Sequence, residues 1–158
     1  MDFEAIYRQY SPKIFRVCMA YLNDHEQAQD VLQETFIAVW QNLKSFRNEA
    51  NISTWIFRIA TNNCLKAINK LKRVRFTEIP HDLTQTQEEN IESELNYLYQ
   101  CIAEMEEMDR IIISLVLEEL PQAEIASIVG LSEGNVRVKI HRIRTRLAEK
   151  FKAHGQFR

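Results

Sequence analysis

Apolar residues recur with the 3.6-residue period of an α-helix along most of the chain. Residues 3–22 follow this pattern, and Pro12 fits the first position of a turn capped by Ser11. A second helix is predicted from Asp24, because Asp24 and Gln27 have the spacing of a capping box. Its apolar side consists of Ala28, Val31, Leu32, Thr35, Phe36, Val39 and Leu43. Its opposite side carries Asp30, Gln33 and Glu34. The simplest interpretation of these three polar residues is a face exposed to solvent.

A third helix is predicted from about Thr54 to Arg73, and it has two distinct sides. The core side consists of Ile56, Phe57, Ala60, Cys64, Ala67, Ile68 and Leu71. The second stripe consists of Trp55, Arg58, Asn62, Lys66, Asn69 and Arg73. Such a stripe suits single-stranded nucleic acid, where cations follow phosphates while aromatic rings and amides meet unstacked bases. The alternative is that Trp55 covers the edge of the core and the basic side chains serve solubility.

The C-terminal half begins with residues 95–119, which are interpreted as two helices. The run IIISLVL at 111–117 also fits a buried strand by periodicity, but its flanks MEEMDR and EEL favour a helix. A short helix then ends near Val129, Gly130 can adopt the positive φ of a turn, and Ser132 can cap the next helix. This order of glycine, cap and apolar positions predicts a helix-turn-helix.

The last helix has a buried stripe and a basic surface. Val136, Ile140, Ile143 and Leu147 lie on the buried side. The outward side and its flanks carry Asn135, Arg137, Val138, Lys139, His141, Arg142, Arg144 and Arg146. In a DNA major groove, Asn135 suits adenine, Arg142 suits guanine or a phosphate, and Val138 suits a thymine methyl group. The alternative is a basic helix that binds polymerase, a membrane or nothing.

Charge is unevenly distributed although the net charge is −2. Residues 1–77 hold 11 Lys and Arg against 7 Asp and Glu, residues 78–129 hold 1 against 13, and residues 130–158 hold 8 against 2. Basic ends suit a polyanion such as DNA, and the acidic middle would be repelled by it. Residues 78–94 are predicted to be a linker whose C-terminal part can be helical.

Other kinds of chemistry have little support in this sequence. Cys18, Cys64 and Cys101 are odd in number and widely spaced, which indicates reduced thiols packed as small hydrophobes. The four histidines are scattered and no glycine-rich phosphate loop occurs, so we expect no enzyme, metal site, cofactor or small-molecule substrate. The charged start MDFEAIYRQY is unlike a signal peptide, which favours a cytoplasmic protein.

Three blocks of the sequence carry a family resemblance. They are DHEQAQDVLQETFIAVWQNLKSF (24–46), STWIFRIATNNCLKAI (53–68) and AEIASIVGLSEGNVRVKIHRIRTRL (123–147). In this order the chain resembles the extracytoplasmic-function group of bacterial RNA polymerase sigma factors. The resemblance implies an all-α fold of two small helical domains: region 2 at 1–77, an acidic linker at 78–94 and a region 4 helix-turn-helix at 95–158.

The resemblance also implies partners and their sites. Core RNA polymerase would bind region 2 through its largest-subunit clamp, at Asp30, Gln33, Glu34, Phe36, Ile37 and Trp40. Region 4 would rest on the flap of the second-largest subunit. The melted strand of promoter DNA would meet Arg47, Asn48, Asn51, Ser53, Thr54, Trp55, Arg58, Asn62, Lys66, Lys70 and Arg73, with a base pocket near Asn62. The upstream duplex would meet the outward side of the last helix, and an anti-sigma factor is a further expected partner.

The implied function is that of a sigma factor without catalysis of its own, which brings polymerase to promoters and assists their melting. The recognition helix begins SEGNVRVK where the family commonly has SEGTVKSR, so the DNA sequence it selects is open. The leading alternative is a free-standing helix-turn-helix regulator that binds duplex operators as a dimer. A protein-binding adaptor would leave the basic last helix without a partner.

Overall fold

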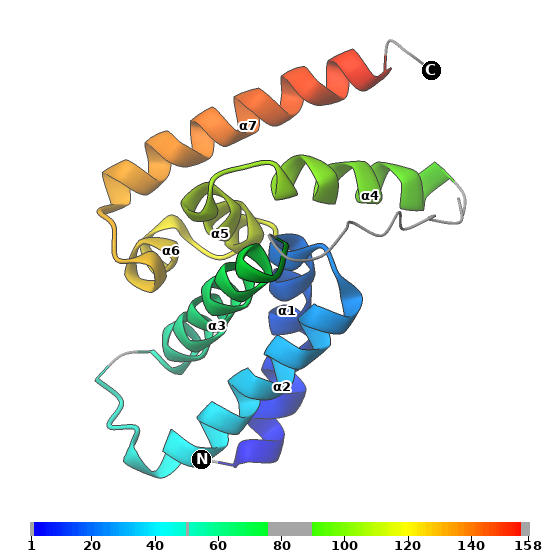
Figure 1. The fold of residues 1–158 in the computed structure, drawn as a ribbon. Helices are drawn as coiled ribbons and strands as arrows, with labels where there is room; N and C mark the ends of the chain where they lie inside the picture. Colours follow the sequence, from blue (N-terminus) through cyan, green and yellow to red (C-terminus); the bar gives the residue numbers. More distant parts are fainter. Residues whose placement is uncertain (1, 50, 76–89, 156–158) are drawn as a thin grey trace.

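The computed structural model describes residues 2–49, 51–75 and 90–155, and within them every regular element is helical (Figure 1). The elements are α1 (Phe3–Leu22), α2 (His25–Asn42), the 3₁₀ turn η1 (Leu43–Ser45), α3 (Ile52–Arg75), α4 (Asn90–Ala103), α5 (Glu107–Val116), α6 (Gln122–Val129) and α7 (Glu133–Gly155). The predicted all-α class is confirmed. Residues 111–116 of the apolar run lie in α5, as its flanks predicted.

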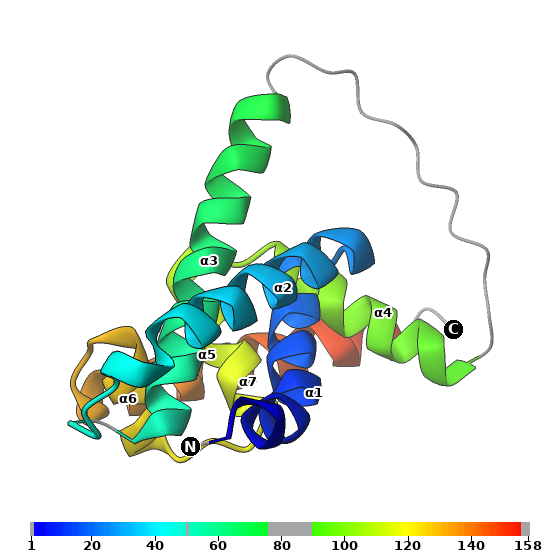
Figure 2. The same ribbon diagram turned by 90° about the horizontal axis from the view of Figure 1, so that it is seen from below.

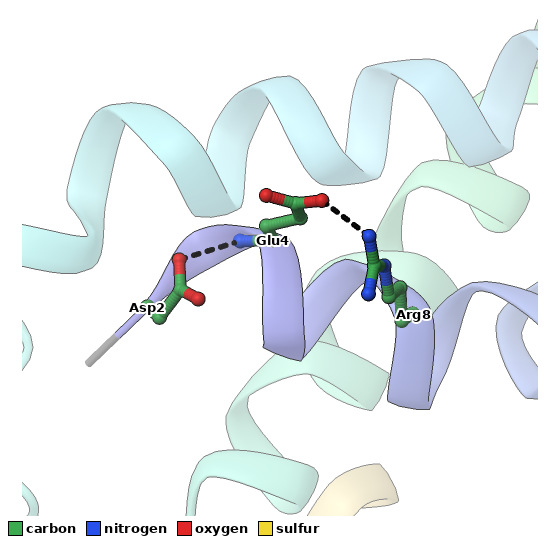
Figure 3. Close-up of polar contacts among 3 residues, drawn as sticks. All are labelled: Asp2, Glu4 and Arg8. Atoms are coloured by element: carbon green, nitrogen blue, oxygen red, sulfur yellow. Dashed lines mark hydrogen bonds and ion pairs between the residues drawn. The ribbon is translucent and has the colours of Figure 1, made fainter.

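Helix α1 starts two residues after the chain begins and continues without interruption. The Asp2 carboxylate accepts a hydrogen bond from the Glu4 backbone N–H at 3.1 Å, and the Glu4 side chain pairs with Arg8 at 2.6 Å (Figure 3). Pro12 lies inside this helix, so the predicted cap at Ser11 is wrong. The helix ends at Leu22, and Asn23 caps it with a φ of 51° and an N–H that donates to the Met19 carbonyl at 2.9 Å.

Two predicted caps are confirmed. The Asp24 carboxylate accepts from the Gln27 N–H at 3.0 Å and starts α2. In the second half, Gly130 has a φ of 76° and ends α6, and Ser132 Oγ accepts from the Asn135 N–H at 3.1 Å at the start of α7. Each of these helix-end features is determined by residues no more than three or four positions away, which is why the sequence alone locates it.

Helices α1, α2 and α3 bury the apolar sides that the sequence predicted. Tyr21, Val39, Ile56 and Phe57 are almost wholly enclosed. Cys18 and Cys64 face each other across α1 and α3 with their sulfur atoms 3.8 Å apart, and all three cysteines are buried and free. The hydrogen bond with Cys18, together with burial, raises the pKa of the Cys64 thiol, so this thiol is protonated and packs as an apolar group.

Helices α4 to α7 form the second helical unit, and its core is the buried face of the helix-turn-helix. Ile112 and Leu115 of α5 pack with Ile125 of α6 and with Val136 and Ile143 of α7. Helix α4 begins at Asn90, inside the segment predicted as linker, while residues 78–89 of that segment lie outside the described residues.

The two helical units pack against each other. Helix α1 contacts α4 and α5, and α3 contacts α6. Figures 1 and 2 show α6 beside the start of α3 and α5 beside α1. The buried apolar residues of the two units belong to one continuous cluster. None of the described helices is both long and apolar enough to cross a membrane.

Candidate nucleic-acid interface

The outward side of α7 and its flanks carry several exposed basic residues. Asn135, Arg137, His141, Arg142, Arg144 and Arg146 are exposed. Val138 is 48% exposed among them, although it is apolar. Lys139 is half-buried and its Nζ lies 3.7 Å from an Asp109 carboxylate oxygen, so α5 engages this one cation of the predicted set.

The helix-turn-helix fixes this surface in place from the inside. Val136, Ile140 and Ile143 are buried against α5 and α6, and Leu147 is half-buried at the edge. Because these residues recur at helical spacing, the residues between them must face outward. A rigid helix that presents amide, aliphatic and guanidinium groups has the chemistry for base edges and phosphates in a major groove.

The second candidate surface combines the loop before α3 with the polar stripe of α3. The exposed members of the predicted set are Arg47, Asn48, Asn51, Arg58, Asn62, Lys66 and Lys70. Trp55 is half-buried and stacks on Phe46 with ring centroids 4.7 Å apart and planes inclined by 25°. Thr54 is only 6% exposed, so its side chain is not accessible to a strand. The side chain of Arg73 lies outside the described residues.

A cavity of about 640 Å³ opens between η1, the following loop and α3. It is lined by Ala38, Asn42, Ser45, Phe46, Arg47, Glu49, Trp55, Arg58 and Ile59. Its wall thus includes the stacked aromatic pair and two guanidinium groups. Asn62, near which the base pocket was predicted, is exposed on α3 and is not among the lining residues.

Two polar residues of the α3 surface already have partners from the second helical unit. Ser53 Oγ donates to the Glu124 carboxylate at 2.6 Å. Arg58 donates from Nε and Nη2 to the backbone carbonyl of Ser127, at 3.0 and 2.6 Å. Both acceptors belong to α6, the first helix of the helix-turn-helix.

Helix α2 carries the surface predicted for polymerase. Asp30, Gln33 and Glu34 are exposed, and Ile37 and Trp40 are exposed large apolar residues, Trp40 at 64%. Phe36 is different: it is 4% exposed and lies edge-on to Tyr7 at 4.9 Å, so it supports the surface from below instead of forming it.

Sequence reasoning missed the contribution of α1 to this surface. Tyr7 is exposed beside Phe36, and the Phe3 ring lies 5.1 Å from the Trp40 ring. Phe3 and Tyr7 are four residues apart, which places them on one side of a helix, and this spacing could have identified them. Asp2, Phe3 and Trp40 line a second cavity of about 670 Å³.

Ion pairs rather than metal ligands dominate the polar chemistry of the described residues. No group of three or more His, Cys, Asp or Glu among them is arranged to hold a metal ion. Arg16 pairs with Glu118 through Nε at 2.6 Å and Nη2 at 2.9 Å, and this hydrogen bond raises the pKa of the Arg16 guanidinium. The Arg16 guanidinium therefore stays charged at neutral pH.

The sequence matches two family descriptions in the same order as its two helical units. Residues 6–74 match Sigma-70 region 2, and residues 95–147 match Sigma-70, region 4. The fold resembles that of the sigma factor RpoE from Bartonella quintana, solved with the anti-sigma factor NepR, with a TM-score of 0.77 and 20% identity over 96% of this chain and 97% of that one. It also resembles CnrH, solved with the cytosolic domain of CnrY, with a TM-score of 0.76 and 21% identity over 96% and 88% of the two chains.

Two proteins of Bacillus subtilis are similar over most of their length. The ECF RNA polymerase sigma factor SigW is 30% identical, over 90% of this chain and 85% of SigW. The RNA polymerase sigma factor YlaC is 31% identical, over 91% of this chain and 88% of YlaC. With both sigma regions present in order, the chain belongs to the extracytoplasmic-function group of RNA polymerase sigma factors, which act in transcription initiation.

Proposed function

We propose that this sigma factor binds promoter DNA at two places, with α7 on an upstream duplex element and the α3 surface on a downstream melted strand. The single observation that carries the proposal is the exposed basic side of α7, held behind a Gly130 turn and a Ser132 cap. The exposed cations, amides and aromatic pair of the α3 surface support its second half. Core polymerase supplies the catalysis, and the chain itself has no enzymatic role.

On the upstream element, base contacts and phosphate contacts come from different residues of α7. Asn135, Val138 and Arg142 share the outward side and are assigned to base edges. Arg137, Arg144 and Arg146 lie toward the flanks and are assigned to phosphates. Three phosphate contacts would give the logarithm of the binding constant a slope of about −3 against the logarithm of salt concentration.

On the downstream element, the cavity beside Trp55 is the best candidate for a flipped base. Its wall offers the ring of Trp55 for stacking and the guanidinium groups of Arg47 and Arg58 for hydrogen bonds or phosphate contacts. A volume of about 640 Å³ has room for a nucleobase. Unstacking a base costs a few kcal/mol, so a pocket that holds one base converts melting into sequence selection. Asn62, Lys66 and Lys70 are then assigned to the strand beyond the pocket.

Core polymerase is assigned to the α2 surface, extended by α1. Trp40, Ile37 and Tyr7 offer apolar contact area, and Asp30 and Glu34 add negative charge at its side. Exposed aromatic residues with a charged rim are typical of protein interfaces. The proposed partner is the clamp of the largest subunit, with region 4 on the flap of the second-largest subunit. The site of action is the cytoplasm, where polymerase works.

An anti-sigma factor is the proposed negative regulator. The sigma factor RpoE was solved with the anti-sigma factor NepR, and this likeness supports a similar partner for the present chain. A groove of about 480 Å³ between α1, α4 and the end of α5, lined by Leu95, Leu98, Tyr99 and Leu117, offers an apolar surface shared by both units.

Run-off transcription with purified core polymerase tests the proposal. Templates selected from random DNA should give new transcripts only when this protein is added. A free-standing regulator would instead bind duplex DNA tightly without polymerase and start no transcript. Absence of any new transcript, together with tight duplex binding, would favour that alternative.

A further inference from the structure

The cations on the outward side of α7 differ in whether the protein already pairs them. Lys139 has its Nζ 3.7 Å from a carboxylate oxygen of Asp109, which lies in the first turn of α5. The side chain of Lys139 is 36% exposed and that of Asp109 only 15%. Four other cations are exposed and have no ion-pair partner among the described residues: Arg137, Arg142, Arg144 and Arg146.

Lys139 lies next to the residues assigned to base edges. It follows Asn135 by four residues and precedes Arg142 by three, so the three side chains are neighbours on the helix surface. It also borders the buried stripe, because Ile140 and Ile143 follow it. A lysine at this edge has a flexible four-carbon stem that can reach a phosphate of a bound duplex. The contact with Asp109 directs its ammonium group toward α5 instead.

Transfer of Lys139 from Asp109 to DNA is opposed by the burial of Asp109. In the described part of the chain, Lys139 is the only cation that pairs with this carboxylate. A carboxylate that is largely removed from water is costly without a compensating charge or hydrogen bond. Departure of Lys139 would also leave the negative charge of Asp109 close to the DNA phosphates, which repel it. While the pair holds, its two charges cancel and Lys139 releases no counterion from DNA.

We propose that Asp109 restrains the DNA affinity of α7 by holding Lys139 away from the phosphates. The exposed arginines of α7 then bind the duplex, and Lys139, which the sequence assigned to DNA, is neutralised by α5. The restraint acts equally on every duplex, because a phosphate contact carries no information about the base sequence. It favours release of the chain from non-specific DNA. This inference rests on the proposed role of α7 as the duplex-binding surface.

A second lysine of α7 provides a matched control. Lys150 has its Nζ 3.0 Å from a carboxylate oxygen of Glu104, which lies just before α5. It follows Lys139 by eleven residues, or about three helical turns, so both lysines lie on the same edge of α7. A recognition helix contacts base edges with its N-terminal residues, and Lys150 lies beyond every residue of α7 assigned to DNA. Glu104→Gln therefore removes the same charge as Asp109→Asn and releases the same kind of side chain, but farther from the bases.

The test measures binding to a labelled random-sequence duplex hairpin by fluorescence anisotropy over a series of salt concentrations. Asp109→Asn should bind about fivefold more tightly at about 0.1 M salt, and its slope against the logarithm of salt concentration should be steeper by about 1, because one phosphate contact is gained. Glu104→Gln should tighten binding by about twofold or less. Asp109→Glu keeps the carboxylate and should bind within about twofold of the unmodified protein.

A double-mutant cycle shows whether Lys139 carries the effect. In a Lys139→Met background, Asp109→Asn should change the affinity no more than Glu104→Gln changes that of the unmodified protein. Equal tightening by Asp109→Asn in both backgrounds would overturn the inference, because the cause would then be general repulsion between Asp109 and DNA. A partly exposed ion pair adds little to stability, so the variants should fold, and circular dichroism checks this. Asp109→Ser replaces Asp109→Asn if the latter is not helical.

Arg144→Ala separates failure of this inference from failure of the proposed function. Arg144 is exposed and assigned to a phosphate, so its loss should weaken binding to the same hairpin and make the salt slope shallower by about 1. Unchanged binding would reject the duplex role of α7 and the inference with it. Weaker binding by Arg144→Ala without tighter binding by Asp109→Asn would reject the restraint alone.

Discussion

The two surfaces proposed to bind DNA differ in how much of their chemistry is available in the free chain. On α7, Asn135, Val138 and Arg142 project from a helix whose other side is buried. On α3, Trp55 is stacked on Phe46, and Ser53 and Arg58 are bonded to α6. Duplex DNA is present before polymerase arrives, whereas a melted strand forms only after polymerase has bound the promoter. The α3 surface can therefore be occupied by other groups until the strand forms, without loss of function.

The largest effect is expected from breaking the core beneath the α3 surface. Phe57 is fully buried on the inner side of α3, and Phe57→Ala should lower the free energy of unfolding by about 3–5 kcal/mol. Because the two units share one apolar cluster, urea unfolding should remain a single transition by both circular dichroism and tryptophan fluorescence. Two separate transitions would show that helices α4 to α7 are stable without helices α1 to α3.

The next effect sharpens the contrast between the surfaces. Arg142→Ala should weaken binding of the free chain to a selected upstream duplex by about 1–3 kcal/mol, because one guanidinium contact to a base is lost. Lys66→Ala removes the same charge from α3 and should change duplex binding much less. Titration by fluorescence anisotropy compares the two variants. Equal losses would mean that α7 does not hold the duplex by itself.

Trp55 and Trp40 form a matched pair of aromatic truncations on different surfaces. Trp55→Ala should lower open-complex formation by about 1–3 kcal/mol, the range for loss of one base–aromatic stack. Trp40→Ala should instead weaken binding to core polymerase, because Trp40 is exposed on α2. Permanganate footprinting measures the open complex, and competition for core enzyme measures binding. A Trp55 variant that lost both in equal measure would place Trp55 outside the strand site.

The sequence located the features that depend on short stretches of chain. The Asp24 and Ser132 caps, the Gly130 turn and the buried stripes of α2, α3 and α7 followed from neighbouring residues. The predictions were less accurate for residues whose environment depends on more distant parts of the chain. Ser11 does not cap a helix because α1 continues through Pro12, and Phe36, assigned to polymerase, is covered by Phe3 and Tyr7.

The contacts between the two units were beyond prediction from the sequence. Ser53 with Glu124 and Arg16 with Glu118 join residues that no local period relates, at separations of 71 and 102. The charge asymmetry indicated only that the basic ends suit a polyanion and that the acidic middle would be repelled by it. Which cation meets which acceptor depends on how α6 packs on α3, and that is a tertiary property.

The smallest effect concerns the turn that aims α7. Gly130 has a φ of 76°, so Gly130→Ala should lower the free energy of unfolding by about 1 kcal/mol through backbone strain, although nothing lies near the added methyl group. Gly134 lies within α7 and has equally free space, so Gly134→Ala should raise stability by up to about 1 kcal/mol. Urea denaturation of both variants measures these opposite signs. If the two signs are opposite, the loss of stability in Gly130→Ala is due to the left-handed backbone at Gly130. If Gly130→Ala unfolds no more easily than the unmodified protein, the turn before α7 does not need a glycine.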